Sequence, residues 1–167
     1  MSFLNKLFGS AKKYPKPDID KLLVDNPTEL LTELTTYLHN ISSYGDHLEK
    51  LTEAQKTFFL NQYIEMEVNN GGFSQYFYNS SGNFAHETLV SLKQIHAVKT
   101  AEILQLAINE FPDAAVPKNE DDRRKILEIM EEKAEGAWEQ LDKRFFSYED
   151  NLHDLNIQFI KQNRSSF

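Results

Sequence analysis

Two carboxylates near the middle of the chain, Glu65 and Glu67, are the residues that come closest to a catalytic pattern. Side chains two positions apart on a helix point about 200° away from each other, so the two acids cannot share one site directly. One interpretation is a buried carboxylate that stabilises the turn after it. The alternative is a catalytic carboxylate in a pocket lined by Tyr63, Tyr76 and Tyr78, which would need a shifted pKa to transfer protons.

Other catalytic chemistry has little support in the sequence. The chain has no cysteine, which excludes disulfides and thiolate metal sites, and its five histidines are scattered singly. Asp150-x-x-His153 is the nearest match to a di-iron motif, and it has no second copy. No Gly-x-Ser-x-Gly motif occurs, and the glycines at 71 and 72 follow a predicted helix rather than a strand, unlike a phosphate-binding loop. We therefore predict no cofactor, no metal and no enzyme activity.

An acidic stripe on a predicted long helix favours a different kind of function. Over positions 121–142 such a helix is about 31 Å long, and acids three or four residues apart are roughly 5–6 Å from each other, which resembles the phosphates along one edge of DNA. The stripe is either an ordinary solvated face or a docking face for a basic partner. Its members are Asp121, Glu128, Glu132, Glu135, Glu139 and Asp142.

The charge of the whole chain points the same way. The net charge is −8, but residues 1–17 carry four lysines and no acid, so residues 18–167 hold 26 acids against 14 bases, a net of −12. Such a body repels nucleic acid and membrane surfaces and suits basic protein partners. The alternative interpretation is charge for solubility alone. We predict no direct binding of nucleic acid.

The elements that position these residues are all predicted to be helical. Capping patterns start helices at Asn26-Pro27, at Thr52 and at Asn119, and apolar residues recur at helical spacing over 27–41, 53–70, 83–95, 100–111, 119–145 and 147–160. Gly136 inside the fifth of these indicates a close helix contact or a bend. We predict a single compact all-α bundle of six or seven helices over residues 19–167, with residues 161–167 frayed.

The stretch 65–82, EMEVNNGGFSQYFYNSSG, joins a helix end to a short aromatic turn between two glycine breaks. It is predicted to be an architectural joint in which Asn70 or Gly71 has a positive φ and Phe73 and Phe77 are buried. Asn69, Gln75 or Asn79 is expected to tie a side chain to the backbone. Ser80-Ser81 is expected to be exposed. The signature residues of this turn are Glu67, Asn69, Asn70, Gly71, Gly72, Phe73, Gln75, Tyr76, Phe77, Asn79 and Gly82.

This NGGF-x-QYF signature resembles that of a bacterial DNA-mimic protein family, and the resemblance extends over roughly residues 27–162, including the segment from Trp138 to Phe146. The resemblance implies a compact all-α fold without known enzyme activity. The naming member of the family is understood to present acidic residues like DNA phosphates to a DNA-binding transcription factor, and to form a dimer. A basic DNA-binding partner and a homodimer are therefore expectations for this chain.

Residues 1–18 are predicted to form a basic N-terminal arm or linker, in which residues 3–8 are a weak candidate for contact with a membrane surface. No transmembrane segment and no signal-peptide pattern occur in the sequence. We interpret the protein as a non-enzymatic, acidic, cytoplasmic interaction protein. The alternatives are a small-ligand or peptide binder using an aromatic cleft around Phe73–Tyr78, and a carboxylate enzyme.

Overall fold

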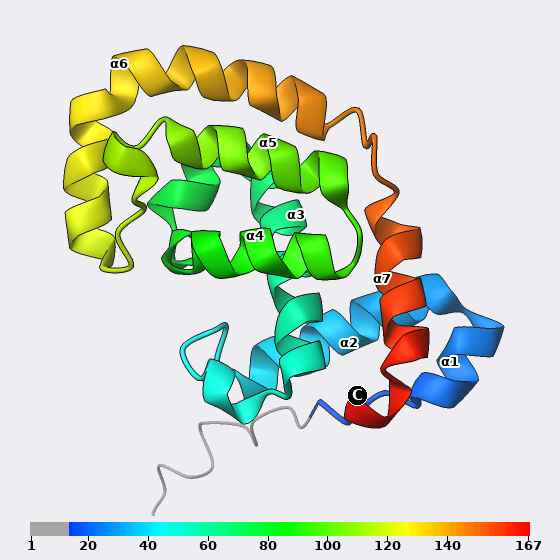
Figure 1. The fold of residues 1–167 in the computed structure, drawn as a ribbon. Coiled ribbons are helices and arrows are strands. Elements are labelled where there is room, and N and C mark those ends of the chain that lie inside the picture. Colours follow the sequence, from blue (N-terminus) through cyan, green and yellow to red (C-terminus); the bar gives the residue numbers. More distant parts are fainter. Residues whose placement is uncertain (1–13) are drawn as a thin grey trace, which may run out of the picture.

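The computed structural model describes residues 14–167, apart from the side chains of residues 131–133 and 135, and that part of the chain contains helices and no strand (Figure 1). This confirms the predicted all-α class. The basic arm lies mostly, and residues 3–8 wholly, outside the described residues. The α-helices are α1 (Ile19–Asp25), α2 (Pro27–Ile41), α3 (Glu53–Tyr78), α4 (Ala85–Gln94), α5 (Val98–Asn109), α6 (Glu120–Phe145) and α7 (Leu152–Gln162).

Short 3-10 helices complete the described chain, and the predicted caps start three of the α-helices. The 3-10 helices are η2 (Leu48–Lys50), η3 (Ser80–Phe84), η4 (Pro112–Ala114) and η5 (Arg164–Ser166). Asn26 accepts a hydrogen bond from the backbone of Glu29 at the start of α2. Thr52 and Gln55 form a capping box at the start of α3. The side chain of Asn119 accepts from the backbone of α6, so these cap predictions are confirmed.

The C-terminal part of the chain differs from the sequence prediction. The last helix begins at Leu152 instead of Ser147, because Asn151 is its N-cap and Tyr148 has a φ of 49° that an α-helix excludes. Residues 161–167 do not fray. They end in η5, and Phe167 is 2% exposed with its ring 6.1 Å from the ring of Phe58.

The core consists of two hydrophobic clusters, and α3 contributes to both. Phe58, Phe59 and Leu60 at its N-terminal half pack with α1, α2 and α7. Phe73 and Phe77 at its C-terminal end pack with α4, α5 and α6. In Figure 1, α4 and α5 lie side by side and α6 curves around the end and top of this pair. Because α3 links the two clusters, its path decides how they sit against each other.

Gly136 in α6 has no neighbour that would explain it by a close approach. A Cβ atom on this residue would meet nothing within 4 Å, so the predicted close helix contact is wrong. The remaining explanation is backbone freedom in a helix that is visibly curved (Figure 1). None of the helices described here is both long and apolar enough to cross a membrane.

The buried C-terminal residue gives a test of the fold. Phe167→Ala should lower the free energy of unfolding by about 3 kcal/mol, because it removes a ring packed against Phe58 and Phe159. Phe146→Ala is the matched control, since Phe146 is 48% exposed and its loss should change the stability by no more than about 0.5 kcal/mol. Urea unfolding measures both. Equal effects of the two substitutions would contradict the packing of the chain end.

Candidate functional site

The signature stretch forms a bend within α3 rather than a separate turn after it. Gly71 (φ −161°, ψ 27°) and Gly72 (φ 69°, ψ −172°) leave the helical conformation, and the helix resumes at Phe73. The positive φ therefore belongs to Gly72, and the prediction of Asn70 or Gly71 is wrong. A Cβ atom on Gly71 would lie 2.9 Å from the Cβ of Gln75. This position therefore also requires glycine, because a larger residue would clash and not because of its φ.

A carboxylate from α6 binds the start of the resumed helix. The backbone N–H of Phe73 donates to Asp142 Oδ1 at 2.9 Å, and a Cβ on Gly72 would collide with the same carboxylate. The arrangement caps the first free N–H of the segment and places a negative charge at the positive end of its dipole. Burial raises the pKa of Asp142 more than this hydrogen bond lowers it. Asp142, predicted as part of the docking face, thus makes a structural contact here.

A buried acid inside the bend ties its two sides together. Glu67 is 7% exposed and accepts hydrogen bonds from Gln75 Nε2 and Asn79 Nδ2, both at 2.8 Å. Asn69, Gln75 or Asn79 was expected to bond the backbone with its side chain. That expectation is wrong, because the amides of Gln75 and Asn79 pair with this carboxylate and the amide of Asn69 donates to the hydroxyl of Tyr148. The carboxylate accepts from donors on the far side of the bend, so its burial is compensated by hydrogen bonds.

A fully buried arginine of α6 binds the end of the same segment. Arg123 is 0% exposed, and its Nε donates to the carbonyl of Phe77 at 2.6 Å while Nη2 donates to that of Asn79 at 2.8 Å. Its Nη1 donates to Pro117 at 2.7 Å. A cation is favourable at a helix C-terminus, where carbonyl groups lack helical partners. A Cβ on Gly82 would lie 2.6 Å from Nε of this arginine, which explains the third glycine of the signature.

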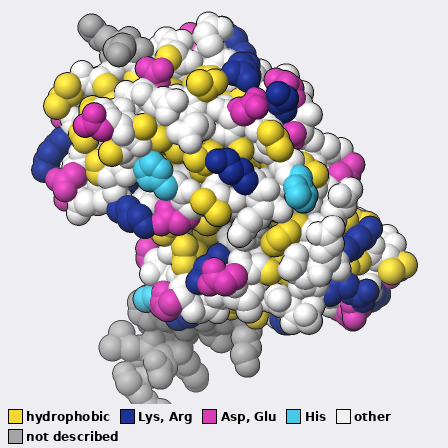
Figure 2. Space-filling model, viewed as in Figure 1, with side chains coloured by type: hydrophobic (Ala, Val, Ile, Leu, Met, Phe, Trp, Pro, Cys, Tyr) yellow, Lys and Arg dark blue, Asp and Glu magenta, His cyan; other side chains and the backbone are white. Residues whose placement is uncertain are grey.

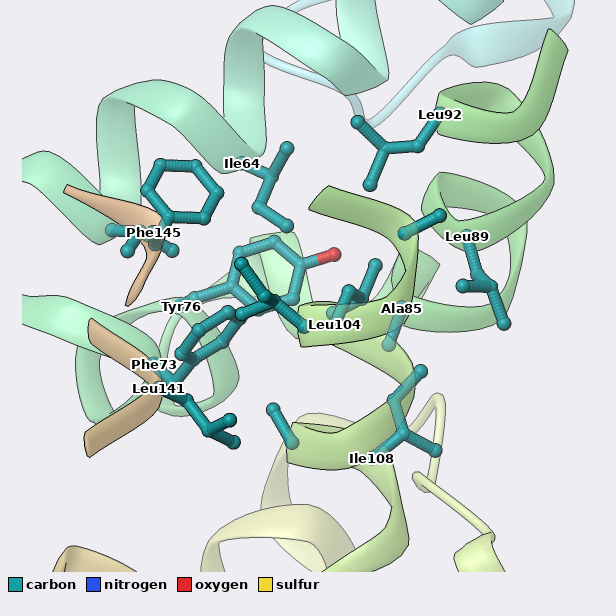
Figure 3. Packing of buried hydrophobic residues seen from close by; sticks show 14 of the residues in the cluster. Ile64, Phe73, Tyr76, Ala85, Leu89, Leu92, Leu104, Ile108, Leu141 and Phe145 are labelled. Atoms are coloured by element: carbon teal, nitrogen blue, oxygen red, sulfur yellow. The ribbon is translucent and has the colours of Figure 1, made fainter. Parts of the chain in front are cut away.

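The aromatic residues of the signature form core rather than a cleft. Phe73, Tyr76 and Phe77 are 0%, 1% and 0% exposed, which confirms the predicted burial of both phenylalanines. Figure 3 shows the rings of Phe73 and Tyr76 among aliphatic side chains of α3, α4 and α5. The proposed cleft around Phe73–Tyr78 is therefore wrong. Tyr78 is 54% exposed and stacks with Arg124.

The tyrosine-lined pocket proposed for a catalytic acid is not formed either. Tyr76 has no accessible surface, and Tyr63 bonds Ser80, with 3.0 Å between the two hydroxyl oxygens. Ser81, expected to be exposed, is 1% exposed and donates to the carbonyl of Tyr76 at 2.6 Å. Turn chemistry explains these serines, but the turn lies inside the molecule.

A groove between α2, α3 and α7 contains the polar cluster that the sequence did not reveal. It has a volume of ≈ 440 Å³, and α2 lines it with Thr28, Thr32, Thr35 and Thr36. Opposite them are Gln62, Glu65 and Asn69 of α3 and His153 of α7. The threonines recur at helical spacing, so their common face was legible in the sequence. Their neighbours come from helices that only the fold brings together.

Glu65 lies in this groove within a chain of hydrogen bonds. The hydroxyl of Tyr148 donates to Glu65 Oε1 at 3.1 Å and accepts from Asn69 Nδ2 at 2.6 Å. Gln62 Nε2 donates to Glu65 Oε2 at 3.4 Å. Burial raises the pKa of Glu65 more than these hydrogen bonds and the nearby His153 lower it. Tyr148, 83 positions away in sequence, has the positive φ of 49° noted above and gave no signal before folding.

The predicted acidic face is divided by the structure. Asp121, Glu128 and Glu139 are exposed, Asp142 is half-buried, and the side chains of Glu132 and Glu135 are outside the described ones. A second imbalance of charge lies in residues 18–53, which hold eight acids and two bases. On the face seen in Figure 2, acidic and basic side chains are interspersed. Among the side chains described, no group of three His, Asp or Glu residues is arranged to hold a metal ion.

Comparison with known proteins identifies a family for most of the chain. Residues 49–163 match the family model described as DMP19-like protein, which spans α3 to α7 and leaves α1 and α2 outside the match. Neither the curated proteins nor the solved structures contain a match.

The carboxylate that caps the resumed helix gives a stability test. Asp142→Ala should lower the free energy of unfolding by about 1–2 kcal/mol, because the N–H of Phe73 loses its acceptor. Glu139→Ala, three positions earlier on α6 at an exposed site, should change it by no more than about 0.5 kcal/mol. Chemical denaturation of both variants decides the matter, and a cost at Glu139 as large as at Asp142 would contradict the cap.

The environment of Glu65 predicts a dependence of stability on pH. An acid whose pKa is raised by folding contributes its full stability below its unfolded pKa of about 4.3 and loses it as pH rises through the folded pKa. Glu65→Gln removes this loss, so the variant should gain stability relative to the natural protein as pH rises from about 4 to 7. Unfolding in urea across this range measures the difference, with exposed Glu102→Gln as control. A difference that shrinks with rising pH would refute the prediction.

Proposed function

Because the chain belongs to the DMP19-like protein family, we propose that it is a non-enzymatic interaction protein that binds a basic, DNA-binding protein in the cytoplasm, as a DNA mimic does. The observation that carries the proposal is the negative charge of residues 18–167, which contain 26 acids and 14 bases. A partner surface built to bind phosphates is attracted by such a field, whereas DNA itself is repelled.

The docking face that we propose follows the outer side of α6. Asp121, Glu128 and Glu139 are exposed and separated by seven and eleven residues, which are close to two and three turns of helix. They therefore share one face of a helix that curves around the outside of the domain (Figure 1). Glu132, Glu135 and Asp142 belong to the same face by their spacing, and Asp142 serves the bend of α3 as well.

Some of the charge on this helix is neutralised locally. Glu120 pairs with Arg124, and Asp122 pairs with Lys125. Asp121, Glu128 and Glu139 make no ion pair with another described side chain, so their charges are available to a partner. The family resemblance also implies a homodimer, and Val98 and Leu106 on α5 are exposed apolar residues that such a contact could cover.

Charge neutralisation on α6 tests the proposal. The immobilised protein should retain basic proteins from a bacterial lysate and release them to duplex DNA, or as salt rises from about 0.1 M to about 1 M and the Debye length falls from about 10 Å to about 3 Å. The variant Asp121→Asn, Glu128→Gln, Glu139→Gln should retain them several-fold less, because it loses three exposed charges of the face.

A variant with the same change in net charge controls for the field of the whole molecule. Glu49→Gln, Glu102→Gln, Asp113→Asn removes three exposed acids scattered over other elements and should keep most of the retention. If the amount of basic protein retained changes neither with salt nor with added duplex DNA, DNA mimicry is refuted. Equal loss in the two triple variants would refute the α6 face as the docking site.

A further inference from the structure

The groove between α2, α3 and α7 offers hydrogen-bond acceptors from its α2 wall. The hydroxyl of Thr32 donates to the carbonyl of Thr28 at 3.3 Å, and that of Thr36 donates to the carbonyl of Thr32 at 2.9 Å. The hydroxyl of Thr35 donates across the groove to Gln62 Oε1 at 3.4 Å. Each hydroxyl has a single hydrogen, so these threonines can present only lone pairs to a ligand.

The α7 side of the groove has the same polarity. His153 Nδ1 lies 3.0 Å from Asp154 Oδ1, and an ionised carboxylate only accepts, so Nδ1 carries the proton. When the ring is neutral, Nε2 is then an acceptor and takes the hydroxyl hydrogen of Thr28 over 3.1 Å. In that state the oxygen of Thr28 is left with its lone pairs, like those of the other three threonines.

Glu65 adds a negative charge to this acceptor-lined surface. It accepts from Tyr148 and Gln62, and it makes no ion pair with any Lys or Arg whose side chain is described. Leu31 and Met66 provide apolar surface within the same groove. The ligand that complements such a site has several donors, a positive charge and an aliphatic stem.

We propose that this groove binds the arginine side chain of a basic protein partner, with Glu65 pairing with the guanidinium group. Guanidinium has five N–H donors and no acceptor, so it can satisfy the carboxylate and the threonine oxygens together. The methylene stem of arginine packs along Leu31 and Met66. The inference rests on the proposed function, because it names the group of the basic partner that the protein recognises.

The surroundings of the groove favour a basic segment over an isolated small cation. Residues 18–36, which include the α2 wall of the groove, hold five acids and one base, and Glu29 and Glu33 are exposed on α2 among the threonines. Their field attracts a positively charged chain toward the groove. The volume of ≈ 440 Å³ lies within the range of about 300–1,000 Å³ that is usual for ligand sites. Burial raises the pKa of Glu65, so the ionised carboxylate is unfavourable when no cation is bound to it. A bound cation would offset this free-energy cost.

Titration with short capped peptides tests the proposal. The probe is acetyl-Gly-Arg-Gly-amide, and its neutral isostere contains citrulline in place of arginine. In NMR spectra of the full chain, the arginine peptide should shift the side-chain amide signals of Gln62 and Asn69, and the citrulline peptide should not. Glu65→Gln should weaken binding by about tenfold or more, because charge-assisted hydrogen bonds are lost. Glu102→Gln on α5 makes the same chemical change far from the groove and should bind as the natural protein does.

Each outcome bears on one claim. Equal binding of the citrulline peptide, or unchanged binding by a folded Glu65→Gln variant, overturns the groove as an arginine site. A third probe, acetyl-Gly-Lys-Gly-amide, tests the choice of side chain, and tighter binding of this peptide than of the arginine peptide overturns the choice of arginine. The triple variant of α6 retains Glu65, so undiminished retention of basic proteins by this variant, together with intact peptide binding, would count against the docking face alone. Intact retention without peptide binding would count against the groove alone.

Discussion

The Phe73–Tyr78 segment of α3 is held at both ends by α6, and most of the fold depends on this contact. Asp142 accepts from the N–H of Phe73 at the start of the segment, and Arg123 donates to the carbonyls of Phe77 and Asn79 at its end. Each charge complements the end of the helix that it meets. The segment carries Phe73, Tyr76 and Phe77 into the core, so its position fixes where α4 and α5 pack.

This contact also explains the shape of α6. Arg123 and Asp142 are nineteen residues apart, about 28 Å along a straight helix, whereas Phe73 and Phe77 are only about 6 Å apart. The α6 backbone must therefore curve to bring both side chains to the segment, as it does in Figure 1. Arg123 meets backbone carbonyls instead of a carboxylate, so its burial is compensated by hydrogen bonds to the helix end and to Pro117.

Local features of the sequence predicted local features of the fold. The caps at Asn26, Thr52 and Asn119 and the all-α class follow from nearby residues, which is why they were legible. The positive φ is at Gly72, where Asp142, 69 positions away in sequence from Phe73, leaves no space for a side chain. The burial of Phe167 likewise depends on Phe58, and Tyr148 reaches Glu65 only after α6 has curved. Such long-range contacts leave no periodic pattern to read.

The opposed directions of Glu65 and Glu67 give the two acids separate roles. Glu67 points into the bend, where two amides satisfy it, and a carboxylate with that many donors is accounted for by structure alone. Glu65 points into a groove whose threonine hydroxyl hydrogens already form hydrogen bonds within the protein. Burial raises the pKa of Glu65. A neutral side chain there would relieve that cost while keeping a partner for Tyr148. An acid whose charged form is disfavoured by burial marks a candidate functional site, because natural proteins depart from local stability rules mainly at functional sites.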